Sequence, residues 1–200
     1  SRESLEVLRQ PLEDGQITVS RAAGSATYPS HFQLVAAMNP CKCGYYGHAT
    51  KACTCTPKAR LAYTAKISGP LLDRIDIHVE VPALDYNELS RTEPAEPSAE
   101  IRSRVIAARA FAAARTDGAL TCNGLMTPAD IRRFCRMDDA GGRLMQTAYD
   151  KFALSARAYD RILKIARTIA DLDGSERIDT PHITEAIQYR SLDRKYWAGR

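Results

Sequence analysis

Four cysteines in two closely spaced pairs carry the clearest chemistry in this sequence. Cys41 and Cys43 are separated by one residue, and Cys53 and Cys55 repeat that spacing after an interval of nine residues. Four thiolates on one short loop can form the tetrahedral site that a structural zinc ion prefers. His48 lies inside the loop and could replace one thiolate. The pattern therefore predicts zinc, and its alternatives are a redox pair or four reduced cysteines in an ordinary loop.

A second candidate is Asn39, which directly follows a short apolar run. The run at 32–38 predicts a strand covered on both faces, and Pro40 requires that strand to stop. In an open α/β sheet, ligands bind beyond the carboxyl ends of the strands. An amide at this position could orient a water molecule or contact a phosphate oxygen. The alternative is an asparagine that caps its own turn.

Three arginines are candidates for anion binding. Arg74 lies between Asp73 and Asp76, where it could reach a phosphate on another subunit or form surface ion pairs. Arg157 falls in the first turn of a predicted helix, beside free N–H groups that suit an anion, although a basic helix face is usually only solvated. Arg21 ends a predicted strand beside a glycine-containing turn. It could contact a DNA backbone, or it could be an ordinary exposed loop residue.

These side chains need secondary structure to position them, and the chain divides into two predicted halves. The first half, residues 1–85, mixes helix and strand. Alternation of apolar and charged residues predicts its last strand. The expected elements are a helix at 1–9 that Pro11 ends or kinks, strands at 17–20, 26–28, 32–38 and 75–81, and a helix at 56–66.

A polar, proline-containing linker at 86–97 precedes a second half, residues 98–200, that is predicted to be wholly helical. Helix start signals occur at Ser98, Thr127-Pro128, Ser155 and Thr180-Pro181. Four or five amphipathic helices with short connections form a small bundle. The predicted fold class is therefore α/β followed by an all-α bundle.

Composition excludes some classes of protein. No apolar run of about 18 residues occurs, which argues against a membrane span. Six cysteines without a visible secretory signal indicate a reducing, cytoplasmic compartment, and Cys122 and Cys135 are expected to be core residues. The net charge of +4 permits a nucleic-acid partner without requiring one. No G-x-x-x-x-G-K-[ST] loop occurs, so these residues contain no complete phosphate cradle.

Several long segments, in this order, resemble the magnesium-chelatase-like family of AAA+ ATPases, of the ComM type. They are SRESLEVLRQPLEDGQITVSRAAGS from residue 1, LVAAMNPCKCGYYG from residue 34, the second cysteine pair, SGPLLDRIDIHVEVP from residue 68, and LSARAYDRILKIARTIADLDGSERI from residue 154. The resemblance implies a partial ATPase core at 1–85, with the cysteine loop at 41–55, followed by a helical lid at 98–200.

The resemblance also implies roles for individual residues. Asn39 corresponds to the sensor-1 residue that positions the attacking water. Arg74 corresponds to an arginine finger acting on a neighbouring subunit, and Arg157 to the sensor-2 residue that reaches the nucleotide from the lid. The region 17–32 corresponds to a pre-sensor hairpin that faces the central pore, which makes Arg21 a candidate DNA contact.

The activity implied by the resemblance is that of a hexameric ring that uses ATP and Mg²⁺ to remodel DNA or migrate its branches, as a helicase-type motor. The family's nucleotide-binding loop lies upstream of Ser1, so we expect the sequence to be a C-terminal fragment that does not hydrolyse ATP alone. Two alternatives remain. One is a zinc-stabilised nucleic-acid-binding module without motor activity, and the other is the motor subunit of a true magnesium chelatase.

Overall fold

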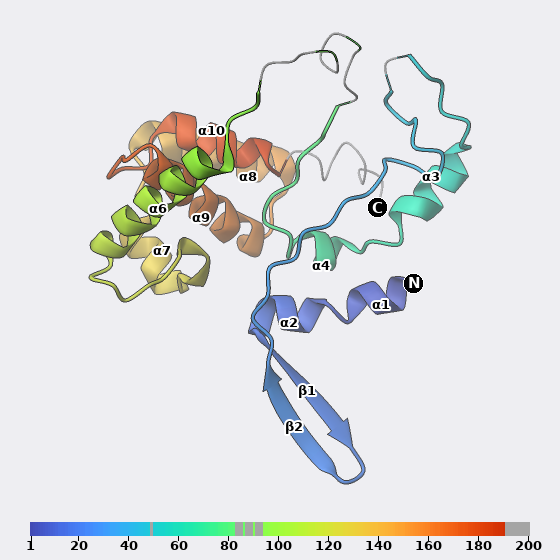
Figure 1. Ribbon diagram of the computed structural model, residues 1–200, viewed down its shortest axis with the longest axis horizontal. Coiled ribbons are helices and arrows are strands. Elements are labelled where there is room, and N and C mark those ends of the chain that lie inside the picture. Colours follow the sequence, from blue (N-terminus) through green and yellow to red (C-terminus); the bar gives the residue numbers. More distant parts are fainter. Residues whose placement is uncertain (49, 83–85, 87–89, 91–93, 191–200) are drawn as a thin grey trace. The chain divides into compact units, whose positions relative to one another are not determined.

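The computed structural model describes residues 1–48, 50–82, 86, 90 and 94–190 of the chain (Figure 1). Within these residues the chain divides into two compact units, residues 1–78 and 79–190. The first unit is helical with one small sheet, and the second is a bundle of helices. Half of the predicted linker at 86–97 lies outside the described residues, as do all of residues 191–200 of the predicted lid.

Two short helices, rather than one, open the first unit. Helix α1 spans Arg2–Glu6, and the Ser1 side chain accepts a hydrogen bond from the Ser4 N–H at its start. Helix α2 spans Arg9–Asp14, so the break comes before Pro11, which is the third residue of α2. This position suits proline because the first-turn N–H groups of a helix have no partner within it. Gly15 ends α2 in the left-handed region, with φ of 61°, and turns the chain into a strand.

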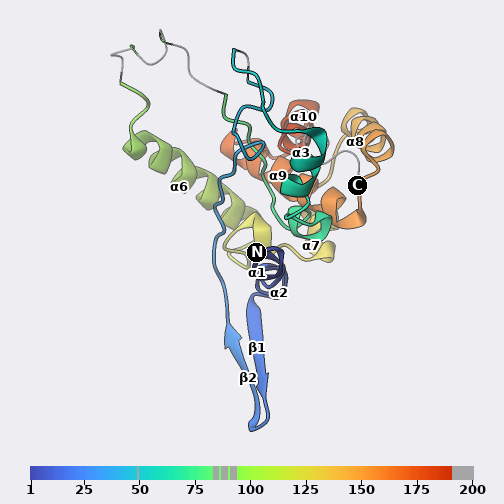
Figure 2. The ribbon, with the colours of Figure 1, turned by 90° about the vertical axis from the view of Figure 1, so that its right-hand side faces the viewer.

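The predicted hairpin is present. Strand β1 spans Gln16–Arg21 and pairs antiparallel with β2, which spans Gly24–Pro29. Cross-strand hydroxyl pairs, Thr18 with Thr27 at 3.0 Å and Ser20 with Ser25 at 2.8 Å, support the pairing. Every residue of both strands is exposed, and Figures 1 and 2 show the hairpin as a long arm that begins beside α2.

Two other predicted strands are wrong. Residues 32–38 and the described residues 75–81 form no strand, and most of their side chains are exposed. Among the described residues the hairpin is the only sheet, and the other β-pairing is an isolated bridge between Met137 and Ile178 in the second unit. A strand needs a neighbour to satisfy its backbone N–H and C=O groups, and no other strand in the described part of the chain lies beside these segments. The first unit therefore contains short helices and a two-stranded sheet, joined by segments without regular secondary structure.

Local capping chemistry defines the remaining helices of the first unit. Helix α3 spans Pro57–Thr64, and the Thr56 hydroxyl accepts a hydrogen bond from the Ala59 N–H, as the sequence predicted. Helix α4 is a single turn, Gly69–Leu72, that begins in the same way at Ser68.

The second unit confirms the predicted helices. Thr127 and Asp130 form a reciprocal capping box at the start of α7, and the Ser155 hydroxyl caps α9. The sequence did not assign α8 individually, and the last helix begins at Thr180 with Asp179 as its cap. The helices of the unit are α6 (Ser98–Arg115), the 3-10 turn η1 (Asn123–Leu125), α7 (Pro128–Phe134), α8 (Asp139–Phe152), α9 (Ala156–Leu172) and α10 (Thr180–Gln188).

The core of the second unit is built around α9, which contacts α6, α7 and α10. Ile162 and Ala166 on α9 are fully buried, as predicted, and Ile183 of α10 packs with them. Cys135 is also buried in this core, whereas Cys122 is only half-buried. In the described part of the chain, no helix is both long enough and apolar enough to span a bilayer.

Candidate functional site

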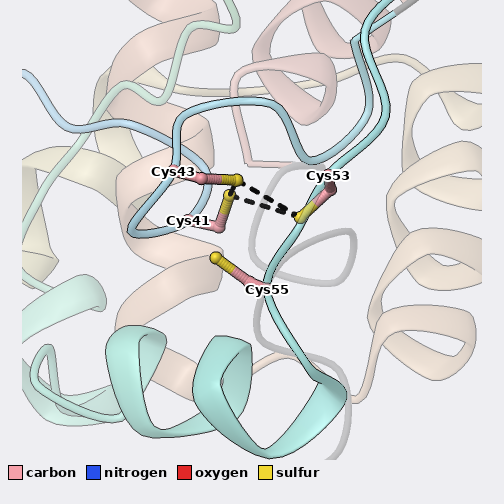
Figure 3. Close-up of side chains that lie close together, drawn as sticks. All are labelled: Cys41, Cys43, Cys53 and Cys55. Carbon is pink, nitrogen blue, oxygen red and sulfur yellow. Dashed lines mark hydrogen bonds between the residues drawn. The ribbon is translucent and has the colours of Figure 1, made fainter.

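The four paired cysteines come together in one cluster. The Sγ atoms of Cys41 and Cys43 lie 3.3 Å apart, and each lies 3.6 Å from that of Cys53. All four Sγ atoms, that of Cys55 included, fall within 4.8 Å of one another, and Figure 3 shows them pointing toward a common centre. A zinc ion with four thiolate ligands needs sulfurs about 3.8 Å apart, because each Zn–S bond is about 2.3 Å long. The predicted ligand set therefore fits zinc.

Tight turns bring the two cysteine pairs together. Gly44 and Gly47 both lie in the left-handed region, with φ of 85° and 83°, which other residues rarely adopt. The Gly44 N–H donates to the Cys41 carbonyl at 3.0 Å and closes the first turn. His48 is not a member of the cluster: its Nδ1 accepts hydrogen bonds from the N–H groups of the residues two and three positions later. The alternative ligand set that includes His48 is not assembled.

The thiols influence one another's ionisation. A hydrogen bond from the Tyr45 N–H lowers the pKa of Cys43 to about 5. The Cys43 N–H favours the Cys55 thiolate, yet the sulfurs of Cys43 and Cys41 together with burial raise the pKa of Cys55 to about 11. Neighbouring thiolates repel one another, so four of them are stable together only around a cation. The donor set is therefore compatible with a divalent metal, which would balance the charge of the four thiolates.

We expect zinc to copurify with the protein and to be lost when one ligand is removed. The wild-type chain should hold a single zinc ion, and Cys41→Ser should lose it, because the hydroxyl of serine is a poor zinc ligand and Cys41 is fully buried in the cluster. Elemental analysis after dialysis against a mild chelator measures this. The matched control is Cys122→Ser, which lies outside the cluster and should keep full occupancy. A wild-type protein without zinc after growth in zinc-supplemented medium would contradict the assignment.

Asn39 lies beside this cluster. It is exposed at the end of the extended segment 32–38, and a Cβ added to Gly44 would lie 3.9 Å from its side-chain amide. Its predicted place after a core strand is not reproduced, since the segment is not a strand. Its role as a sensor stays a prediction.

Arg74 is held inside the first unit. It follows α4, and its side chain is only 10% exposed. Its Nε donates to the Arg9 carbonyl at 3.1 Å, Nη1 donates to the Pro70 carbonyl at 2.7 Å, and Nη2 forms an ion pair with Glu13. Arg74 therefore links α2 to α4, and its role as an arginine finger stays a prediction.

The other two arginines lie on exposed surfaces. Arg157 is the second residue of α9, next to the N-terminal cap of that helix, as the sequence predicted. Arg21 is the last residue of β1 and pairs with Gly24 across the hairpin turn. Asn39, Arg74 and Arg21 belong to the first unit, whereas Arg157 belongs to the second.

Sequence reasoning missed a buried ion network in the second unit. Arg167 and Asp171 of α9 have side chains 1% and 2% exposed, and the Arg167 Nε donates to Asp171 Oδ1 at 3.0 Å. Arg115 forms a two-pronged ion pair with the same carboxylate, and the Asn123 Nδ2 donates to Asp171 Oδ2 at 2.7 Å. The available signal was an arginine and an aspartate four residues apart on the apolar face of α9.

In a comparison with known proteins, both units match models of magnesium chelatase subunit ChlI. The model of the family "Magnesium chelatase, subunit ChlI" matches residues 1–89, and that of "Magnesium chelatase, subunit ChlI C-terminal" matches residues 95–190. The chain belongs to the magnesium-chelatase-like family. Its family is one of AAA+-type ATPases, which agrees with the resemblance inferred from the sequence motifs.

Curated relatives of this magnesium-chelatase-like chain include competence protein ComM of Haemophilus influenzae, 41% identical over 194 residues, and YifB of Escherichia coli, 42% identical over 195 residues. Each alignment covers 96% of the chain but 37% of the relative. A Mycobacterium tuberculosis protein, Rv2897c, is 37% identical over 195 residues. The chain thus spans little more than a third of the length of these relatives.

Proposed function

We propose that these residues act within a ring-forming AAA+ ATPase, a hexamer in the cytoplasm, that couples ATP hydrolysis to the remodelling or branch migration of DNA. The observation that carries the proposal is the 41% identity with a competence protein along 96% of this chain. The exposed hairpin with Arg21 supports a DNA partner, because it offers a basic contact for a phosphate backbone.

Each candidate residue has a role in this proposal. Bound ATP with Mg²⁺ supplies the phosphoryl group whose transfer to water drives the motor. Asn39 orients the attacking water through its amide. Arg74 stabilises the negative charge that develops on a neighbouring subunit's nucleotide, and Arg157 contacts the nucleotide of its own subunit from the helical region. The cysteine cluster, with zinc, holds the loop next to Asn39 and takes no part in hydrolysis.

The test is ATP turnover by complete subunits that include these residues. We expect branched DNA to stimulate turnover, and we expect the 200 residues alone to hydrolyse no ATP, because they lack a phosphate-binding loop. The measurement compares phosphate release with branched DNA, linear duplex DNA and a porphyrin substrate. Stimulation by porphyrin instead of DNA would favour a true magnesium chelatase. ATP turnover by the 200 residues alone would contradict the expectation that hydrolysis needs the rest of the complete subunit.

A second candidate function is a zinc-stabilised nucleic-acid-binding module without motor activity, which the cysteine cluster favours. It predicts salt-sensitive binding of DNA by the 200 residues together with complete subunits whose ATP turnover does not respond to DNA. The proposed motor, in contrast, requires the ATP turnover of complete subunits to respond to DNA.

A further inference from the structure

The first unit contains a long stretch without acidic residues. Residues 15–72 include neither aspartate nor glutamate, although the whole chain has 24 acidic residues and a net charge of only +4. Basic side chains are spread through the same stretch, so its charge suits a polyanionic partner. They are Arg21, Lys42, Lys51, Lys58, Arg60 and Lys66.

Most of these cations belong to the cysteine loop and the start of α3. Lys42 and Lys51 lie within the loop, and Lys58 and Arg60 lie on the first turns of α3. A zinc ion with four thiolates carries two negative charges. The four cations exceed that charge, so the loop remains basic when it is loaded with metal.

Two tyrosines lie among these cations, partly exposed to solvent. Tyr45 is 37% exposed and Tyr46 is 38% exposed. The Lys51 ammonium lies 5.2 Å from the centroid of the Tyr45 ring, and the Arg60 guanidinium lies 4.5 Å from that of Tyr46. Both distances are in the range of cation–π contacts. Two aromatic rings therefore lie side by side in the sequence, each with its own cation.

The cysteine cluster fixes the backbone that carries both rings. The N–H groups of Tyr45 and Tyr46 donate to the sulfurs of Cys43 and Cys41, respectively. Arg60 is anchored as well, because its Nη1 donates to the Cys55 carbonyl at 3.0 Å. The metal-binding residues thus position the aromatic rings and one of the cations, which lowers the entropy lost when a ligand binds.

Exposed aromatic rings interspersed with fixed cations are typical of sites for single-stranded nucleic acid. Unpaired bases stack on aromatic rings, and the phosphates between them contact lysine or arginine. Bases inside a duplex are already stacked on one another and cannot use such rings. An acidic protein partner would need the cations but not two exposed rings.

We propose that Tyr45 and Tyr46 stack against the bases of single-stranded nucleic acid whose phosphates contact Lys51 and Arg60. The site deepens the proposed function and rests on its DNA substrate, since branch migration exposes unpaired bases. The tyrosine site is separate from Arg21 on the hairpin, whose proposed contact is with the phosphate backbone of DNA alone.

The test is binding of a short labelled oligothymidylate by the zinc-loaded protein, followed by fluorescence anisotropy. The double variant Tyr45→Leu, Tyr46→Leu should weaken binding about tenfold or more, because it removes two stacking partners. The double variant with phenylalanine keeps both rings and should bind within about twofold of wild type. The matched control is Tyr86→Leu, since Tyr86 is 80% exposed and lies outside the loop. Zinc content checks that each variant keeps the folded cluster.

The outcomes separate this site from the proposed function. If the leucine variant binds as tightly as wild type while Arg21→Ala weakens binding, then the hairpin carries the DNA contact, and the tyrosine site is wrong while the DNA motor stands. Binding of polyglutamate as tightly as of oligothymidylate, insensitive to the tyrosines, would overturn the site in favour of an acidic protein. If the protein does not bind oligothymidylate at low salt, the tyrosine site is also wrong. In that case the proposed function is tested separately, by whether DNA stimulates ATP turnover of complete subunits.

Discussion

Replacing Arg74 by alanine is expected to lower ATP turnover by about a thousandfold or more in rings of complete subunits that include these residues. The reason is that an arginine acting from a neighbouring subunit stabilises charge that develops only in the transition state, so its loss affects turnover more than nucleotide binding. Phosphate release and equilibrium binding of a fluorescent ATP analogue measure the two effects. Arg74→Lys should recover little activity, because an ammonium lacks the planar fork of guanidinium.

The contacts of Arg74 supply the control for this experiment. In the structure its guanidinium forms an ion pair with Glu13 of α2, so binding a phosphate requires it to exchange one anion for another. Glu13→Gln removes the competing charge with little change of shape and should retain most of the turnover. If Arg74 only clamps α2 to α4, then Glu13→Gln and Arg74→Ala will impair turnover and thermal stability in parallel. That result would contradict the finger assignment.

Replacing Asp171 by alanine is expected to reduce the free energy of unfolding of the second unit by about 3–5 kcal/mol. The substitution leaves two guanidinium groups, those of Arg167 and Arg115, without the carboxylate that both contact. Burial already lowers the pKa of Arg167, and Asp171 counteracts that effect. A buried cation that loses its counter-charge costs much more free energy than the intact ion pair contributes.

Urea unfolding of the chain, followed by helical circular dichroism, measures this loss. The matched control is Asp173→Asn, two residues further along, whose carboxylate is 63% exposed and contacts His182 Nε2 at 3.1 Å. It should cost less than about 1 kcal/mol, since exposed pairs contribute little. Equal unfolding midpoints for the two variants would mean that the network does not stabilise the bundle.

Local signals in the sequence predicted the helices well because helix ends depend on residues close in the chain. Thr56, Thr127 and Ser155 each cap a helix at its predicted start, through a hydrogen bond to an N–H three residues later. The hairpin was equally predictable, since its turn and alternation lie within 14 residues, Gln16–Pro29. The clustering of four cysteines followed from their spacing in the same way.

Interactions between distant residues account for what the sequence did not predict. The segments 32–38 and 75–81 have strand-like composition, but a strand exists only beside another strand, and composition does not report whether one is there. The buried network around Asp171 was not recognised because two of its members, Arg115 of α6 and Asn123 of η1, lie far away in the chain. The cation–π contact between Arg60 and Tyr46 was missed for the same reason, because Arg60 comes from α3 and not from the cysteine loop.

Helix α2 has a mechanical consequence for the hairpin. The strand β1 begins two residues after α2 ends, and Arg74 contacts α2 at both of its ends, through the Arg9 carbonyl and the Glu13 carboxylate. A load applied at the hairpin tip is therefore transmitted along β1 to a helix that the Arg74 guanidinium contacts near both ends. Any displacement large enough to move α2 must stretch or break those two contacts, so the stiffness of the arm depends on the Arg74 side chain.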